Sequence, residues 1–289
     1  MSSNEAEAGL RRRLHRYLNA VEPLAIPSVI GICITGSLAT PYADEHSDID
    51  LTVVIEDDGV EPDPERFSNK LIPLKATVQR RVPLEKYSFD WRDGHIDIDV
   101  VGVSELRAEG KTLQTRWEYD NAEILVDSEH QLSSCLAEEI PLSDEEQHTL
   151  VQEYADEFLF IAQWDTHKAC LRESYRTAHR AATCAADDAL ALLFLQDGQF
   201  VPREKWIVDA LGSVQLVDEE LVNLTWEASR IIACDPHDVH RRVQALHSIW
   251  ERLQPTLEQR GFFDEDAFTW EAPPREICML NSTTSNESS

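Results

Sequence analysis

The sequence predicts an α/β (α+β) fold, in which a small mixed β-sheet flanked by helices is followed by an all-α helical bundle. Three observations predict this fold class. Residues 28–35 and 48–55 are short apolar runs rich in β-branched side chains, which is typical of buried strands. Residues 5–22 place apolar side chains at helical spacing ahead of these runs. From about residue 140 the pattern becomes helical.

The elements of the first half follow from their own patterns. A helix over 5–22 is predicted by an apolar stripe made of Leu10, Leu14, Leu18 and Val21. A β-hairpin is predicted over 82–103, because Asp93-Gly94 separates two strand-like runs. An Asp-Gly pair suits the positive φ angles that a two-residue hairpin turn requires.

The second half is predicted to be a separate helical domain. Ser143 and Glu146 fit a capping box, which marks a helix start. Helical stretches follow at 150–171, 172–195, 202–211 and 218–259. We therefore expect one domain over 1–135, a helical domain over 140–265, and a flexible polar tail over 271–289.

The charge balance excludes some classes of function. The chain of 289 residues has 54 acidic and 26 basic residues, a formal charge of −28. General nucleic-acid binding needs a positive surface, and adhesion to anionic membranes needs one too, so neither is expected. Strong self-repulsion is tolerated where salt screens it, which favours a protein from a halophile's salt-rich cytoplasm.

No apolar run is long enough to span a membrane, and the polar start lacks a signal peptide's apolar core, so we expect a cytoplasmic protein. The six cysteines are scattered and form no C-x-x-C pair. Cys33 lies in an apolar run and Cys184 lies among alanines, so both are predicted to be small buried hydrophobes.

Two aspartates in the second apolar run suggest a metal site. Side chains alternate across a strand, so Asp48 and Asp50 point to the same face, about 6.6 Å apart along it. Two carboxylates this close repel each other unless a cation or solvent lies between them. Carboxylate oxygens are hard ligands that suit Mg²⁺, which takes one or two of them together with substrate phosphates.

A Gly-Ser pair stands ten residues before these aspartates, at the end of the first apolar run. Gly36 lets the backbone approach a phosphate closely, and the Ser37 hydroxyl and nearby N–H groups suit phosphate oxygens. Such a loop would hold the phosphates of a nucleotide over the paired aspartates. Phosphate anchor and metal clamp are the parts of a phosphoryl-type transfer.

The stretch TGSLATPYADEHSDIDLTVV, residues 35–54, resembles the signature of the DNA polymerase β-like nucleotidyltransferase superfamily. It is most like the group that includes minimal and aminoglycoside or lincosamide nucleotidyltransferases. The resemblance implies a short mixed sheet flanked by helices and transfer of a nucleoside monophosphate from an NTP, expected to be ATP. It also implies that Gly36 and Ser37 hold the triphosphate, with Ser47 beside them, and that Asp48 and Asp50 bind two Mg²⁺ ions.

Active members of this superfamily use a third carboxylate, which the resemblance assigns to Asp97 or Asp99. Both alternate with apolar residues in GHIDIDVV and therefore share one face. A turn at Asp93-Gly94 would put Asp97 opposite Asp90 and Asp99 opposite Ser88. The spacing leaves the choice open. The third acid would bind metal and take the proton from the attacking hydroxyl.

The helical half resembles, more weakly, the domains attached to such enzymes, in the stretch LLFLQDGQFVPREKW. Lys205 is the candidate cation for the β- or γ-phosphate or the leaving pyrophosphate, and Arg176, Arg180 and Arg203 are competing candidates. The alternative is that Lys205 lies on the surface beside a core Trp206. Asp187 and Asp188 are predicted to lie on a helix surface, although one of them facing an acceptor is a second possibility.

The sequence therefore predicts a Mg²⁺-dependent nucleotidyltransferase, with a small molecule or a protein as acceptor. Modification of an antibiotic and AMPylation of a partner protein are both options within this class. The alternative is a nucleotide-binding or regulatory module of the same fold without turnover. A nucleic-acid polymerase of the superfamily is disfavoured by the charge of −28.

Overall fold

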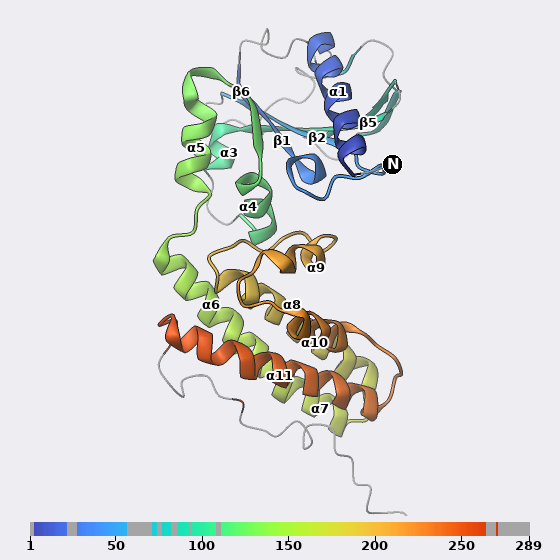
Figure 1. Ribbon diagram of the computed structural model, residues 1–289, viewed down its shortest axis with the longest axis vertical. Helices are drawn as coiled ribbons and strands as arrows, with labels where there is room; N and C mark the ends of the chain where they lie inside the picture. The colour runs from blue at the N-terminus through green and yellow to red at the C-terminus, as the bar shows by residue number, and fades with distance from the viewer. Residues whose placement is uncertain are drawn as a thin grey trace, which may run out of the picture. The chain divides into compact units, whose positions relative to one another are not determined.

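The computed structural model of the chain divides into two compact units, Met1–Pro141 and Leu142–Ser289, which are described separately (Figure 1). The division falls just after the segment 135–140 between the two predicted domains. The structure describes residues 3–21, 28–56, 71–73, 77–81, 86–92, 94–107, 111–263 and 270. Asp93 and the predicted tail over 271–289 lie outside these residues.

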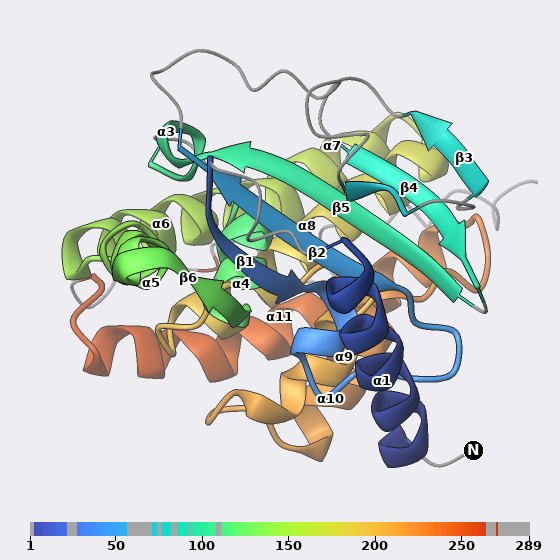
Figure 2. The same cartoon turned by 90° about the horizontal axis from the view of Figure 1, so that it is seen from above.

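Unit 1 is built on one mixed sheet of six strands in the order β3-β4-β5-β2-β1-β6. Figure 2 shows this twisted sheet with β3 and β6 at its opposite edges. The strands are β1 Val29–Thr35, β2 Ile49–Ile55, β3 Thr77–Arg81, β4 Lys86–Trp91, β5 Gly94–Gly102 and β6 Glu123–Asp127. Only the β2–β5 pair is parallel, and the four other pairs are antiparallel.

One face of the sheet is covered by α1, Ser3–Val21. Leu10, Leu14 and Tyr17 of α1 pack against the buried isoleucines and leucine of β1 and β2. Leu18 and Val21 lie partly buried against the same cluster, so the predicted stripe is confirmed. The predicted strands over 28–35 and 48–55 are β1 and β2, and the apolar residues 49, 51, 53 and 55 of β2 are all buried.

On the opposite face, among the described residues of unit 1, an apolar cluster lies at one end. Cys33, Val54 and Val101 form a second cluster with Leu132 and Cys135 of α5, Gln131–Glu139. The other short elements of this unit are η2 Gly36–Ala39, α3 Val103–Leu106, α4 Leu113–Asp120 and η3 Ser128–His130. The end of this face that lies beyond the cluster carries the aspartates of β2 and β5.

The predicted hairpin is β4–β5, but its register differs from the prediction. Trp91 pairs with Gly94, so Gly94 belongs to β5 and not to the turn that the sequence predicts at Asp93-Gly94. Arg92 adopts a φ of 59°, the positive value that such a turn demands. Asp97 consequently lies opposite Ser88, and Asp90 lies opposite His95. A slip of two residues leaves every side chain on its predicted face.

Unit 2 is helical, so the α/β fold class with a helical second half is confirmed. Its elements are α6 Asp144–Leu159, the π-helical segment η4 Phe160–Asp165, α7 Thr166–Leu171, α8 Tyr175–Leu195, α9 Ile207–Ala210, η5 Leu211–Ser213, α10 Glu219–Ser229 and α11 Pro236–Gln259. The Ser143 hydroxyl accepts a hydrogen bond from the Glu146 N–H at 3.1 Å, as the capping box predicts. No helix in the described ranges is long and apolar enough to cross a membrane.

Two predicted helices of unit 2 are shorter than expected. Of residues 202–211, only Ile207–Ala210 are α-helical, followed by η5. The predicted helix over 218–259 is interrupted between α10 and α11. There the Asp238 carboxylate accepts hydrogen bonds from the N–H groups of Ile232 and Ala233, which holds these residues out of a helix.

A buried arginine connects α8, α10 and α11. The Arg242 side chain is fully buried and donates to the carbonyls of Ala228 and His179 at 2.6 and 2.8 Å. It also donates to the Thr183 hydroxyl at 2.8 Å. Burial lowers the pKa of Arg242 to about 10, partly offset by the charge of Asp238, so the group stays charged at neutral pH.

We expect Arg242→Ala to lower the free energy of unfolding by about 3 kcal/mol or more, because it leaves buried carbonyls without donors. Arg252→Ala on the same helix is the matched control. Arg252 pairs with Asp218 and Glu220 at the surface and should cost less than about 1 kcal/mol. Urea unfolding followed by circular dichroism measures both, and equal losses would contradict this role of Arg242.

Candidate active site

Gly36 is packed directly against the carboxylate of Asp50. It follows the last residue of β1 and has a φ of 65°, which glycine adopts without strain. A Cβ atom added at Gly36 would lie 2.2 Å from Oδ2 of Asp50 and 2.8 Å from its Cγ. Glycine is therefore required here twice, by the backbone conformation and by the close approach of Asp50.

The residues around Gly36 form a tight turn. Thr35 pairs with Asp50 across β1 and β2, and Gly36 opens the 3₁₀ turn η2. The Ser37 side chain is buried, with 6% of the residue exposed, and its carbonyl accepts hydrogen bonds from the N–H and hydroxyl of Thr40 at 3.1 and 2.9 Å. The turn therefore brings its backbone close to the first carboxylate of β2.

Asp48 and Ser47 precede β2. Asp48 is exposed and stands one residue before the strand, while Ile49 is fully buried on the opposite face. The Ser47 hydroxyl donates to Asp44 Oδ1 at 3.0 Å and accepts from the Asp44 N–H at 3.0 Å. Ser47 would have to give up this bond to Asp44 to donate to a nucleotide, and its role there stays a prediction.

The parallel pairing of β2 and β5 brings the aspartates of the two strands side by side. Asp50 is the register partner of Asp97, and Thr52 is the partner of Asp99. Neighbouring strands lie about 4.8 Å apart, so Asp97 is the acid of β5 adjacent to Asp50. Ile96 and Ile98 are fully buried on the other face, as the alternation predicts.

Asp99 lies one step farther along the same face, toward the covered end. Its neighbour Thr52 is buried, and Cys33 on β1 pairs with Thr52 in the sheet. The pKa of Tyr119, which packs in the cluster at that end, is raised mainly by burial and further by nearby acids that include Glu105 and Asp99. Asp99 therefore lies nearer to the covered cluster than Asp97 does.

His95 is a site residue that the sequence analysis missed. Its Nδ1 lies 2.8 Å from Asp90 Oδ1, and its Nε2 lies 3.1 Å from Asp97 Oδ1 and 2.9 Å from Ser88 Oγ. His95 stands two residues before Asp97 on β5, so strand alternation alone places it on the aspartate face. That signal was available in the sequence.

The acids around His95 favour its protonated form. Burial alone would lower the pKa of His95. The hydrogen bond to Asp90 and the charges of Asp97, Asp48 and Asp90 act in the opposite direction and together outweigh burial, so the pKa of His95 is raised above its ordinary value. Asp48 stands before β2 and Asp97 on β5, so acids from both places contribute to the raised pKa of this imidazole. The carboxylate face thus carries a concentrated negative field.

The donor chemistry of this face fits Mg²⁺. Asp48, Asp50 and Asp97 supply hard carboxylate oxygens, and Mg²⁺ is typically held by one or two carboxylates together with phosphate oxygens. In the part of the chain that the structure describes, no three His, Cys, Asp or Glu side chains converge as a preformed metal cage. One oxygen of Asp97 is instead hydrogen-bonded to His95.

Lys205 belongs to unit 2 and is exposed. Its Nζ lies 4.1 Å from the centre of the Trp206 ring, and Trp206 itself is buried. The structure therefore agrees with the alternative of a surface lysine beside a core tryptophan. A contact between Lys205 and phosphate stays a prediction.

Asp187 is exposed on α8 as predicted, but Asp188 is half-buried. Its Oδ2 atom is buried and accepts no hydrogen bond within the described residues. Burial, followed by the charges of Glu157 and Asp187, raises the pKa of Asp188 to about 7. Sequence spacing placed both acids on a helix but did not separate the half-buried one from the exposed one.

Comparisons with known proteins return solved structures only; no family model and no curated protein matches the chain. A nucleotidyltransferase-like protein from Exiguobacterium sibiricum 255-15 is 13% identical, covers 86% of this chain and 78% of its own, and has a TM-score of 0.45. The spectinomycin adenyltransferase AAD(9) from Enterococcus faecialis, solved with ATP and spectinomycin, is 12% identical, with coverages of 83% and 99% and a TM-score of 0.36. CdnC from E. coli MS115-1, in complex with HORMA-deltaN, is 13% identical, with coverages of 90% and 93% and a TM-score of 0.30. At these values the likeness does not assign an activity to this chain.

We expect Gly36→Ala to destabilise unit 1 more than a positive φ alone explains, because the new methyl group meets the Asp50 carboxylate. Gly261→Ala is the matched control, since Gly261 has a φ of 77° and nothing within 4 Å of an added Cβ. An alanine forced to positive φ costs about 1–2 kcal/mol. Thermal unfolding measures the excess cost at Gly36, which should shrink in an Asp50→Ala background. An excess that Asp50→Ala leaves unchanged would contradict the clash.

We expect His95 to stabilise the folded chain at low pH. A pKa raised in the folded state gives stability that is fully present below the unfolded value of about 6.5 and is lost as pH rises through the folded value. The difference in unfolding free energy between wild type and His95→Gln, measured in metal chelator, should therefore shrink as pH rises through that window. A difference independent of pH would show that His95 acts by packing only.

Proposed function

We propose that this protein is a Mg²⁺-dependent nucleotidyltransferase that moves a nucleoside monophosphate, AMP with ATP as donor, to an acceptor hydroxyl. The acceptor is a small molecule or a protein. One observation carries the proposal: the Gly36 turn approaches Asp50 so closely that no other residue fits, while Asp50 is paired in register with Asp97. A phosphate-binding turn and a pair of acids on adjacent strands are the two halves of a phosphoryl-type site.

The proposal gives each residue a distinct task. The backbone at Gly36 and Ser37 binds the triphosphate, with Lys205 and Ser47 as further candidate contacts. Asp48 and Asp50 hold Mg²⁺, which neutralises phosphate charge when it is bound.

The acceptor oxygen forms a bond to the α-phosphorus as the bond to the bridging oxygen breaks, and pyrophosphate leaves. Asp97 takes the proton of the acceptor hydroxyl and serves as the third metal-binding acid. His95 is a positioning residue in this scheme, because it hydrogen-bonds Asp97 rather than the reacting atoms. Asp99 was an equal candidate for the third acid, but the register supports Asp97.

We expect transfer of label from α-³²P-labelled NTPs to an acceptor from a metabolite panel, or to protein, with Mg²⁺ or Mn²⁺ at high salt. Asp48→Asn and Asp50→Asn should each lower the rate at least 100-fold, because metal binding is lost. Glu56→Gln is the matched control, since it removes one acid that directly follows the other end of β2. No labelling by wild type under any of these conditions would overturn the proposal, and nucleotide binding without transfer would favour the non-catalytic module.

Substitutions of Asp97 and Asp99, the two acids of β5, should have different effects on the rate in the same assay. We expect Asp97→Asn to lower kcat by a factor of about 10² to 10⁴, the range for loss of a general base. Asp99→Asn, one register step away beside Thr52, should lower it less than about tenfold. The reverse order would assign the third carboxylate to Asp99.

A further inference from the structure

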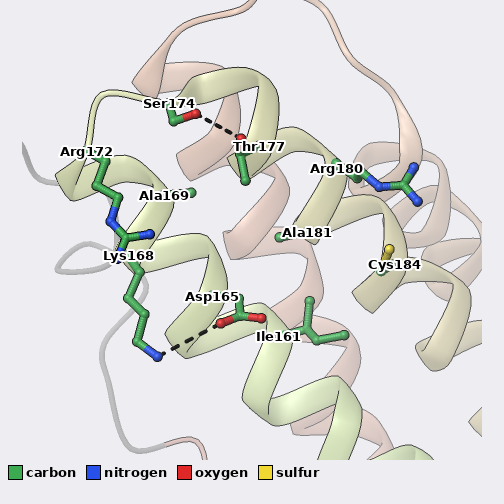
Figure 3. A pocket seen from close by; sticks show the side chains of 10 residues that line it. All are labelled: Ile161, Asp165, Lys168, Ala169, Arg172, Ser174, Thr177, Arg180, Ala181 and Cys184. Carbon is green, nitrogen blue, oxygen red and sulfur yellow. Dashed lines mark hydrogen bonds and ion pairs between the residues drawn. The ribbon is translucent and has the colours of Figure 1, made fainter.

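Unit 2 contains a pocket that the proposed reaction does not use. It lies between the π-helical segment η4, α7 and the beginning of α8, and its volume is about 420 Å³. Figure 3 shows Lys168 and Arg172 on one side of the pocket and Arg180 with Cys184 on the other. The remaining lining residues are Ile161, Asp165, Ala169, Ser174, Thr177 and Ala181.

The charge of the lining is opposite to that of the chain. Three basic side chains, Lys168, Arg172 and Arg180, face one acidic side chain, Asp165. The ratio of basic to acidic residues is thus 3 to 1 in the pocket and 26 to 54 in the whole chain. In a protein of formal charge −28, this pocket attracts anions where the average surface repels them.

The basic groups are available to a ligand. Lys168 is held loosely, 4.0 Å from Asp165 and 5.5 Å from the centre of the Phe160 ring. Within the described part of the chain, Arg172 and Arg180 form no ion pair with an acidic side chain. Both arginines are exposed, so their guanidinium groups reach solvent at the pocket.

Polar groups at the start of α8 lie between the basic side chains on the two sides of the pocket (Figure 3). Ser174 is the N-cap residue of this helix of 21 residues, and its side chain does not cap the first turn. Its hydroxyl pairs with that of Thr177 at 2.8 Å, and both residues line the pocket. The positive end of the helix dipole adds to the field of the arginines.

The rest of the lining is apolar or weakly polar: Ile161, Ala169, Ala181 and the half-buried Cys184. Cys184 was predicted to be a buried hydrophobe, but it is partly accessible because the pocket opens beside it. Ile161 and Asp165 come from η4, and π-helical turns of this kind frequently occur at functional sites. The volume falls within the range of about 300–1,000 Å³ typical of small-molecule sites.

We propose that this pocket binds a small organic anion with an apolar body and a phosphate or carboxylate head. Lys168 and Arg172, on one side of the pocket (Figure 3), bind the head through charge-assisted hydrogen bonds, Arg180 attracts it from the other side, and Ser174 and Thr177 contribute hydroxyl donors. The apolar body packs against Ile161 and the alanines. This site lies wholly in unit 2, so it stands or falls independently of the proposed transfer.

Cys184 provides a local readout of occupancy in the full-length protein. Phenyl phosphate and benzoate serve as probes with the two head groups, inorganic phosphate as a head without a body, and benzamide as the neutral control. Alkylation by iodoacetamide in metal chelator is followed at each cysteine by peptide mass spectrometry. We expect at least one organic anion to slow alkylation of Cys184 fivefold or more, with benzamide inactive. Cys234, exposed elsewhere in unit 2, is the internal control and should not change.

Substitutions then test the role of the basic side chains that line the pocket. The double variant Arg172→Ala/Arg180→Ala should weaken protection of Cys184 at least tenfold in probe concentration. Arg176→Ala is the matched control, since it removes an exposed arginine of α8 that does not line the pocket. Comparison of the phenyl phosphate and benzoate concentrations then identifies the preferred head group.

Four results would overturn the proposal. The first is equal protection of Cys184 and Cys234, and the second is protection by benzamide as strong as by the anions. The third is protection that survives the double variant. The fourth is absence of protection by every anion, which would exclude the site as a binder of small organic anions, whether or not the chain transfers nucleotides.

Discussion

The contact between Gly36 and the Asp50 carboxylate is the constraint on which the candidate active site depends. It fixes where β1 must end, because the chain turns at the one residue that tolerates both the positive φ and the close approach. It also places the Asp50 carboxylate beside the η2 turn, so this carboxylate and the backbone groups that follow Gly36 lie close together. The parallel β2–β5 pairing then extends this arrangement to Asp97.

Within the described residues of unit 1, the apolar cluster on the aspartate face ends before these acids. The cluster around Leu132 and Cys135 closes one end of the face, and strands there carry Val54 and Val101. Beyond it the same alternation places Asp50 and Asp97 on this face. Apolar burial and carboxylate clustering are therefore separated across the sheet and, on the aspartate face, also along the strands. His95 supplies a positive partner to two of the acids in the same region.

The sequence predicted the elements with strong periodicity, including α1, β1, β2 and the hairpin. It also predicted the alternation that puts Asp97 and Asp99 on one face. It did not predict β3 or β6, because TVQRR is polar and EILVD is too short to show a clear pattern. The pairing of Asp50 with Asp97 could not be predicted from the sequence, because parallel strands are joined by a long connection and no turn fixes their register. The predicted register of the hairpin was wrong by two residues, because the turn contains Arg92 at a positive φ, which is uncommon for this residue type.

The π-helical segment η4 affects how residues before and after it are arranged along one continuous helix. α6, η4 and α7 follow one another without a gap, and a π turn accommodates an additional residue relative to an α-helix. Each residue of an α-helix turns the chain by about 100°. A relative lacking one residue between Phe160 and Asp165 would therefore close this segment as an ordinary α-helical turn and keep Lys168 on the same side of α7. The additional residue is taken up within η4 itself, so the side of the helix that carries Lys168 does not depend on it.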